Sequence, residues 1–136
     1  MCYYSLEGIF MWEIEITETF EKWWQALTEK EQDDVTAIIE LLKERGAHLP
    51  FPYSSDVAGA RFSQMKELRI QSHGDPIRIF YAFDPRRIAI LLLGGMKKGK
   101  NEKRFYYKEY VAKADTLYED HLKRLNEDED RKSRNR

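Results

Sequence analysis

The densest run of cations in this 136-residue chain follows directly on its most apolar segment. Ile90–Leu93 is entirely apolar, whereas residues 97–104 carry four Lys and one Arg, with Glu102 among them. These five cations are Lys97, Lys98, Lys100, Lys103 and Arg104. Cations concentrated in this way favour an anionic partner, with nucleic acid as the leading candidate. The alternative interpretation is a solvated loop whose charges only confer solubility.

Two arginines upstream could meet these cations at one site. A strand projects alternate side chains to opposite faces, so "KELRI" and "IRIFYAF" place Arg69 and Arg78 on neighbouring strands. We expect both on the sheet face opposite the N-terminal helices, in a concave site bordered by the cations that follow Gly95. Each could instead be a simple ion-pair partner, Arg69 of a carboxylate near Glu67 and Arg78 of an acid in the C-terminal tail.

These residue types suit metal-free RNA cleavage. In that reaction the 2′-hydroxyl attacks the adjacent phosphorus. It requires a proton acceptor, stabilisation of charge on the phosphate oxygens and a proton donor for the leaving 5′-oxygen. Arginine remains charged and grips phosphate with two parallel hydrogen bonds, and a lysine whose pKa is lowered by neighbouring cations can transfer a proton. The predicted catalytic residues are Arg69, Arg78, Lys97 and Lys98.

A second group of residues is predicted to bind the RNA without reacting. Single-stranded RNA offers its phosphates to cations and its bases to aromatic platforms. Two tyrosines follow directly on the basic run. The predicted RNA-binding residues are Lys66, Lys100, Lys103, Arg104, Tyr106 and Tyr107.

No metal site and no cofactor are expected. Cys2 is the only cysteine, so neither an intramolecular disulfide nor a cysteine-built metal site is predicted. Each of the three histidines is interpreted as structural or solvent-exposed rather than catalytic. Asp75 and Asp84 head turns, where Asp commonly bonds its own backbone, and both are interpreted as structural.

Charge is distributed unevenly along the chain. The formal net charge is only −1, yet residues 1–60 hold four Lys/Arg against 12 Asp/Glu, while residues 61–113 hold 13 against five. The length suits one domain. No apolar run reaches the roughly 18 residues that a membrane span needs, and the first ten residues lack the basic start of a signal peptide. We therefore expect a cytoplasmic protein without a membrane partner.

The order of apolar patterns predicts the elements. Met11–Thr17 alternates like a strand, and residues 18–45 have helical spacing, with Thr28 and Glu31 as a capping box and Gly46 as a C-cap. Three strand-like runs joined by short turns follow, and then a helix. These are Met65–Ile70, Ile77–Phe83 and Arg87–Leu93, with the helix at Lys108–Leu125. The prediction is an α+β domain, β-α-α-β-β-β-α, with two N-terminal helices packed on an antiparallel sheet.

Three segments are expected along the chain. Residues 1–10 are predicted to be an N-terminal extension that adds little to the fold, and residues 11–126 form the domain. Residues 127–136 are too polar to pack and are predicted to be a disordered tail.

The strands and the last helix resemble the RelE/ParE toxin superfamily, and within it the phage-derived HigB-like branch. The similarity spans about residues 12–122. Three features carry it: "KELR", the strand "RIFY", and the apolar strand that leads into "GGMKK". They occur in the order seen in that superfamily, before the helix "YVAKADTLYEDHL". One departure is the segment "GKNEKRFYY", where many relatives have T-x-K-T-P.

The resemblance implies the toxin of a bacterial toxin–antitoxin pair that cleaves messenger RNA on the ribosome. Its partner would be a helix-turn-helix, HigA-like antitoxin. By resemblance, Arg69 and Arg78 grip phosphate, Lys97 and Lys98 match a lysine pair of which one transfers a proton, and Tyr107 corresponds to a stacking aromatic. Two alternatives stay open: a ParE-like inhibitor that acts by binding DNA gyrase, and a non-toxic module that only holds an antitoxin.

Overall fold

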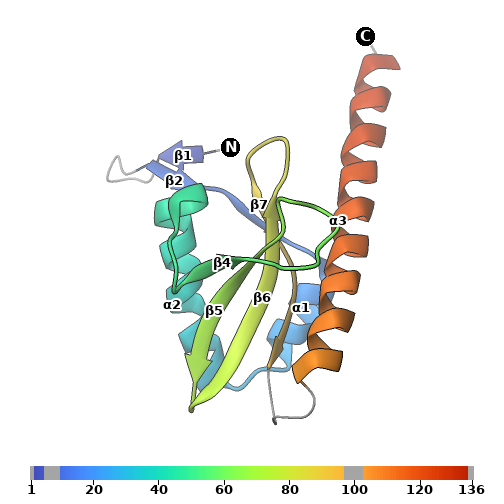
Figure 1. The fold of residues 1–136 in the computed structure, drawn as a ribbon. Coiled ribbons are helices and arrows are strands. Elements are labelled where there is room, and N and C mark those ends of the chain that lie inside the picture. The colour runs from blue at the N-terminus through green and yellow to red at the C-terminus, as the bar shows by residue number, and fades with distance from the viewer. Residues whose placement is uncertain (1, 5–9, 97–102, 135–136) are drawn as a thin grey trace.

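The computed structural model describes residues 2–4, 10–96 and 103–134, with side chains described for 11–96 and 107–134. It is an α+β domain in which a central sheet lies between helices on its two faces (Figure 1). The strands are β1 (Cys2–Tyr4), β2 (Phe10–Trp12), β3 (Ile14–Ile16), β4 (Ser54–Asp56), β5 (Lys66–Ser72), β6 (Asp75–Phe83) and β7 (Ala89–Met96). The helices are α1 (Glu18–Gln25), α2 (Glu29–Arg45), the short 3₁₀ helix Gly46–His48, and α3 (Lys103–Arg134).

The main sheet has five strands in the order β3-β7-β6-β5-β4. The predicted antiparallel meander is confirmed for β5, β6 and β7, and β4 adds a short antiparallel edge that the sequence does not reveal. The sheet is nevertheless mixed, because β3 pairs in parallel with β7. An alternating pattern identifies a strand but not the direction of its partner, so this pairing could not be predicted from residues 14–16.

The predicted first strand is divided in two. Residues 14–16 join the main sheet, whereas Phe10–Trp12 forms a separate two-stranded sheet with Cys2–Tyr4. Part of the N-terminal segment, predicted to add little, is therefore paired with the domain through this small sheet.

Local sequence signals start and stop the two N-terminal helices. The hydroxyl of Thr17 accepts a hydrogen bond from the amide of Phe20 at 3.0 Å, and it donates to the Leu92 carbonyl at 2.6 Å. This cap ties the start of α1 to β7. The predicted capping box of Thr28 and Glu31 is present at the start of α2.

The sheet separates two apolar cores. Between the sheet and helices α1 and α2 lie side chains such as Phe20, Val35 and Leu42, packed with alternate residues of the strands. On the other face, α3 contributes Val111 and Tyr118 to a second core. The sheet face opposite the N-terminal helices, expected to form an open concave site, is thus partly covered by α3.

Helix α3 is longer than predicted at both ends and runs past the edge of the sheet (Figure 1). The tail predicted to be disordered is helical as far as Arg134, and its side chains from Glu127 to Arg134 are exposed. A highly charged segment can continue a helix that is already nucleated by packing, since propagation adds one hydrogen bond per ordered residue. No helix among the described residues is long and apolar enough to span a bilayer.

Candidate functional site

Arg69 and Arg78 lie directly opposite each other on β5 and β6. Both belong to the sheet face that α3 partly covers, because their neighbours Leu68, Ile70 and Ile77 all enter the core beneath α1 and α2. Like charges directly opposite on a sheet destabilise it. This pair is therefore a costly arrangement for the fold alone, which is the kind of feature that a functional site retains.

Arg78 is buried, with only 7% of its surface exposed. Its Nη1 donates to the Ile77 carbonyl at 3.0 Å, while its Nε has no hydrogen-bond partner among the described residues. Burial lowers the pKa of Arg78, and the charge of Arg69 lowers it further. The charged form of the Arg78 guanidinium is thus disfavoured by burial and by repulsion from Arg69. The guanidinium also has an N–H group without a hydrogen-bond partner among the described residues, which an anion could satisfy.

Glu67 provides the counter-charge in this cluster. It is 4% exposed and accepts hydrogen bonds from Arg69 Nη1 at 3.2 Å and from the Ser55 hydroxyl at 3.1 Å. The alternative of an ion pair for Arg69 is thus realised, with a carboxylate on its own strand. One carboxylate faces two guanidinium groups, however, so the cluster retains a net positive charge suited to phosphate.

Tyr107 brings the start of α3 to the same cluster. Its ring lies 5.7 Å from that of Phe80. Burial raises the pKa of the Tyr107 hydroxyl to about 12, helped by the charge and hydrogen bonding of Glu67, while Arg69 and Arg78 oppose the shift. The phenol is therefore protonated at neutral pH and can donate a hydrogen bond. Of the predicted RNA-binding residues, Tyr107 is the one whose described side chain joins the two arginines.

Lys66 lies apart from this cluster. It occupies the same face of β5 as Leu68, and its ammonium pairs with Asp56 of β4 at 2.9 Å. Because side chains alternate along a strand, three residues of separation place Lys66 and Arg69 on opposite faces. Charge alone therefore does not bring Lys66 to the face that carries Arg69.

The basic run follows the cluster along the chain. β7 continues past the glycines, where the sequence interpretation had ended it, and Gly95 pairs with Arg78. Lys97, Lys98 and Lys100 lie outside the described residues. Residues 103, 104 and 106 belong to α3, but their side chains are not described.

Asp84, interpreted as structural, and His121, interpreted as structural or exposed rather than catalytic, form a hydrogen-bonded network that supports the fold. The buried Asp84 carboxylate accepts hydrogen bonds from the backbone amides of Arg86 and Ile88 and from the Arg86 guanidinium. It is also hydrogen-bonded to His121 Nε2 at 2.9 Å. This network joins the β6–β7 turn to α3.

Sequence reasoning missed three residues of the cluster. Glu67 shares the face of Arg69 by alternation along β5 but was not assigned to the site, whereas the position of Ser55 depends on the pairing of β4 with β5. The third, Phe51, lies in the loop before β4, with the Arg69 guanidinium 5.4 Å from its ring centre. The position of Phe51 between two prolines was the available signal for an ordered, exposed aromatic.

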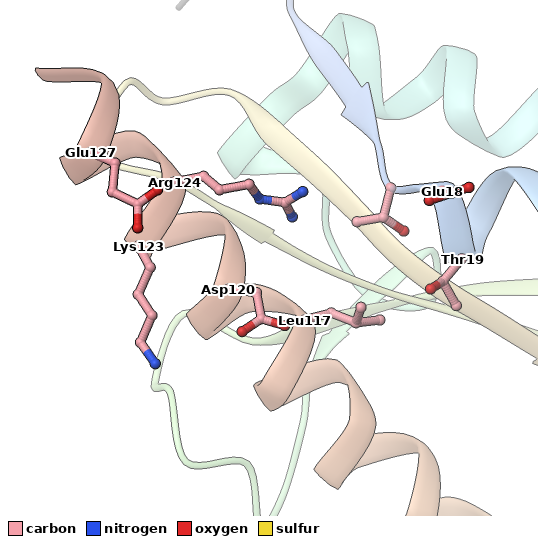
Figure 2. A pocket seen from close by; sticks show the side chains of 8 residues that line it. Glu18, Thr19, Leu117, Asp120, Lys123, Arg124 and Glu127 are labelled. Atoms are coloured by element: carbon pink, nitrogen blue, oxygen red, sulfur yellow. The ribbon is translucent and has the colours of Figure 1, made fainter. Parts of the chain in front are cut away.

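A second groove lies between α1 and the distal half of α3 and shares no residue with this cluster (Figure 2). Its volume is about 490 Å³. Charged side chains of both signs line it: Glu18, Asp120, Lys123, Arg124 and Glu127. Arg124 extends from α3 towards the side of the groove where Glu18 and Thr19 lie, and Asp120 lies about one turn earlier on α3 (Figure 2). With acids outnumbering cations, this groove suits phosphate less well than the paired arginines do.

The amino-acid sequence matches a known family of phage-derived proteins. Residues 22–119 match the family described as phage derived protein Gp49-like, and the chain belongs to that family. It is similar to two proteins of Mycobacterium tuberculosis. One, named "Putative toxin HigB2", is 39% identical over 106 residues, which cover 77% of this chain and 52% of that protein. The other, named "Putative toxin HigB3", is 48% identical over 86 residues, which cover 63% of this chain and 73% of that protein. The chain thus spans about half the length of the first relative.

Proposed function

We propose that this chain is the toxin of a toxin–antitoxin pair and that it cleaves messenger RNA, without a metal, at the cluster of Arg69, Arg78 and Tyr107. The names of the two relatives support the toxin assignment. The single observation that carries the chemistry is the direct pairing of Arg69 with Arg78, one buried and both on one face, against a single carboxylate.

In the proposed reaction the two guanidinium groups hold the scissile phosphate. The 2′-oxygen forms a bond to phosphorus, and the bond from phosphorus to the 5′-oxygen breaks, leaving a cyclic phosphate and a 5′-hydroxyl. A neutral Lys97 or Lys98 accepts the 2′-hydroxyl proton, and Tyr107 donates a proton to the leaving 5′-oxygen. Arg69 and Arg78 stabilise the charge that develops on the phosphate oxygens.

The proposal includes partners as well as chemistry. A helix-turn-helix, HigA-like antitoxin would neutralise the chain, and the substrate would be messenger RNA on the ribosome in the cytoplasm. Reading the neighbouring gene for a helix-turn-helix protein is an inexpensive first check.

Induction of the protein in bacteria, followed by mapping of transcript 5′ ends, tests the function. Wild type should arrest translation and generate new 5′ ends, and Arg78→Ala should lose at least about 100-fold of this cleavage, as for removal of one transition-state donor. Lys66→Ala is the matched control, because it removes a cation from the opposite face of the same sheet. DNA damage without new transcript ends, insensitive to Arg78→Ala, would instead indicate gyrase inhibition. Normal growth of cells that contain folded wild type would contradict a toxin.

A further inference from the structure

Two exposed aromatic side chains lie beside the arginine cluster. Phe51 is 69% exposed and Tyr53 41% exposed. Among the described residues, the large hydrophobic side chains that are exposed are these two and Ile16. Two of the three therefore fall within three residues of one loop, between the 3₁₀ helix and β4. Clustered exposed apolar side chains mark a surface that contacts something else.

The loop is ordered and attached to β5. The amides of Tyr53 and Ser54 both donate to the Pro50 carbonyl, at 3.0 and 3.1 Å. The Tyr53 carbonyl accepts from the Arg69 amide at 2.9 Å, which continues the β4–β5 pairing by backbone contact. A platform that is already rigid before binding loses little entropy when a ligand stacks on it.

The loop and the arginines share a groove. A cavity of about 450 Å³ is lined by three residues of α2 and by Pro52, Tyr53, Arg69, Ile70, Gln71 and Arg78. The acid among those α2 residues, Asp34, is paired with Lys30 at 2.9 Å. The aromatic loop and both arginine residues therefore border the same cavity.

We propose that Phe51 and Tyr53 stack on a nucleobase next to the phosphate held by Arg69 and Arg78. This inference rests on the proposed function and deepens it, because it assigns the base-binding part of the same site. Unstacked bases of single-stranded RNA pack on aromatic rings and on arginine planes. Arg69 connects the two parts: its guanidinium bonds to Glu67 and lies 5.4 Å from the Phe51 ring centre.

The geometry also separates two contributions to binding. Phosphate contacts through Arg78 are independent of the bases, whereas stacking on Phe51 requires a base to be present. An oligonucleotide with a normal backbone but no bases should therefore respond to changes at Arg78 and not to changes at Phe51.

NMR titration with two uncleavable probes tests this inference. The first probe is a mixed-sequence 12-nucleotide 2′-fluoro RNA, and the second has the same backbone without bases. Phe51→Ala and Tyr53→Ala should each weaken binding of the first probe about 5- to 100-fold, the range for loss of one stacked base. Neither change should alter binding of the second. Phe51→Trp should bind the first probe like wild type.

The matched control is Ile16→Ala, which removes the third exposed apolar side chain, on the opposite edge strand β3. It should not change the affinity for either probe. If Arg78→Ala weakens both probes while Phe51→Ala weakens neither, stacking is wrong and the phosphate site stands. If Arg78→Ala binds both probes as wild type does, or if wild type binds neither at millimolar concentration, the proposed site itself is wrong.

Discussion

The ring of Trp23 lies where a side chain at Gly94 would be: a Cβ built on Gly94 falls 2.5 Å from the ring carbons. α1 thus packs directly on the backbone of β7, close to the point where the strand approaches the basic run. Gly95, the next residue, pairs with Arg78. The contact between Trp23 and Gly94 therefore fixes the end of β7 that borders the candidate site.

Gly94→Ala should destabilise the protein by overpacking. A contact under 3 Å with a large ring cannot be relieved without moving α1 or β7, so we expect a loss of about 1–3 kcal/mol in the free energy of unfolding. Urea denaturation measures it. In a Trp23→Ala background the same change should cost far less, because the ring that it meets is gone. An equal cost in both backgrounds would show that the contact is not responsible.

Arg78→Met should separate stability from activity. The substitution removes a buried charge that is poorly paired and relieves its repulsion by Arg69, so the free energy of unfolding should stay the same or rise by about 1–3 kcal/mol. Transcript cleavage should be lost. Thermal unfolding and 5′-end mapping on the same variant give the two results. A strongly destabilised Arg78→Met protein would assign Arg78 to the fold instead of the site.

The sequence was most informative where a structural feature depends on neighbouring residues. The capping box at Thr28 and Glu31 is local, and the placement of Arg69 and Arg78 on one face follows from simple alternation along two adjacent strands. Alternation also shows that Lys66 faces away, which grouping by charge had obscured.

The remaining features depend on distant contacts. The position of Ser55 beside Glu67 is set by β4, a strand of three residues inside a stretch rich in turn residues. The covering of the arginine face by α3 depends on packing of Tyr107 and Val111, which one sequence pattern cannot orient. The position of Ser55 and the covering of the arginine face by α3 are therefore determined by tertiary packing, which the sequence patterns did not predict.

Stability should fall at alkaline pH because folding raises the pKa of tyrosines that it buries in whole or in part, among them Tyr81, Tyr107 and Tyr118. Burial raises the pKa of Tyr81 to about 12, and burial with Glu67 raises that of Tyr107 to about 12. A group whose pKa is raised on folding stabilises the protein below its unfolded pKa, near 10, and this contribution is lost as pH rises towards 12. For the buried Tyr81 the full loss is on the order of 3 kcal/mol.

Urea denaturation between pH 9 and 11.5 measures this loss, and Tyr81→Phe should flatten the dependence. Glu67→Gln discriminates Tyr107 from Tyr81, because it should lower the pKa of Tyr107 and leave that of Tyr81 unchanged in a tyrosinate absorbance titration. Equal movement of both transitions would show that Glu67 does not act on Tyr107 directly.

Asp84→Asn should weaken the attachment of α3 to the sheet. Burial alone would raise the pKa of Asp84, but hydrogen bonds from His121, Arg86 and the Ile88 amide outweigh it, so the net direction is down. A carboxyl whose pKa is lowered on folding stabilises the protein above its unfolded pKa, near 4, and this contribution is lost as pH falls below that value.

An amide at position 84 cannot reproduce these charge-assisted contacts, so we expect Asp84→Asn to lose about 2–4 kcal/mol in the free energy of unfolding at neutral pH. Urea unfolding at pH 7 and pH 3.5 should show the difference between wild type and Asp84→Asn shrinking at the lower pH. A difference that is the same at both values would mean that the Asp84 charge does not hold the turn to α3.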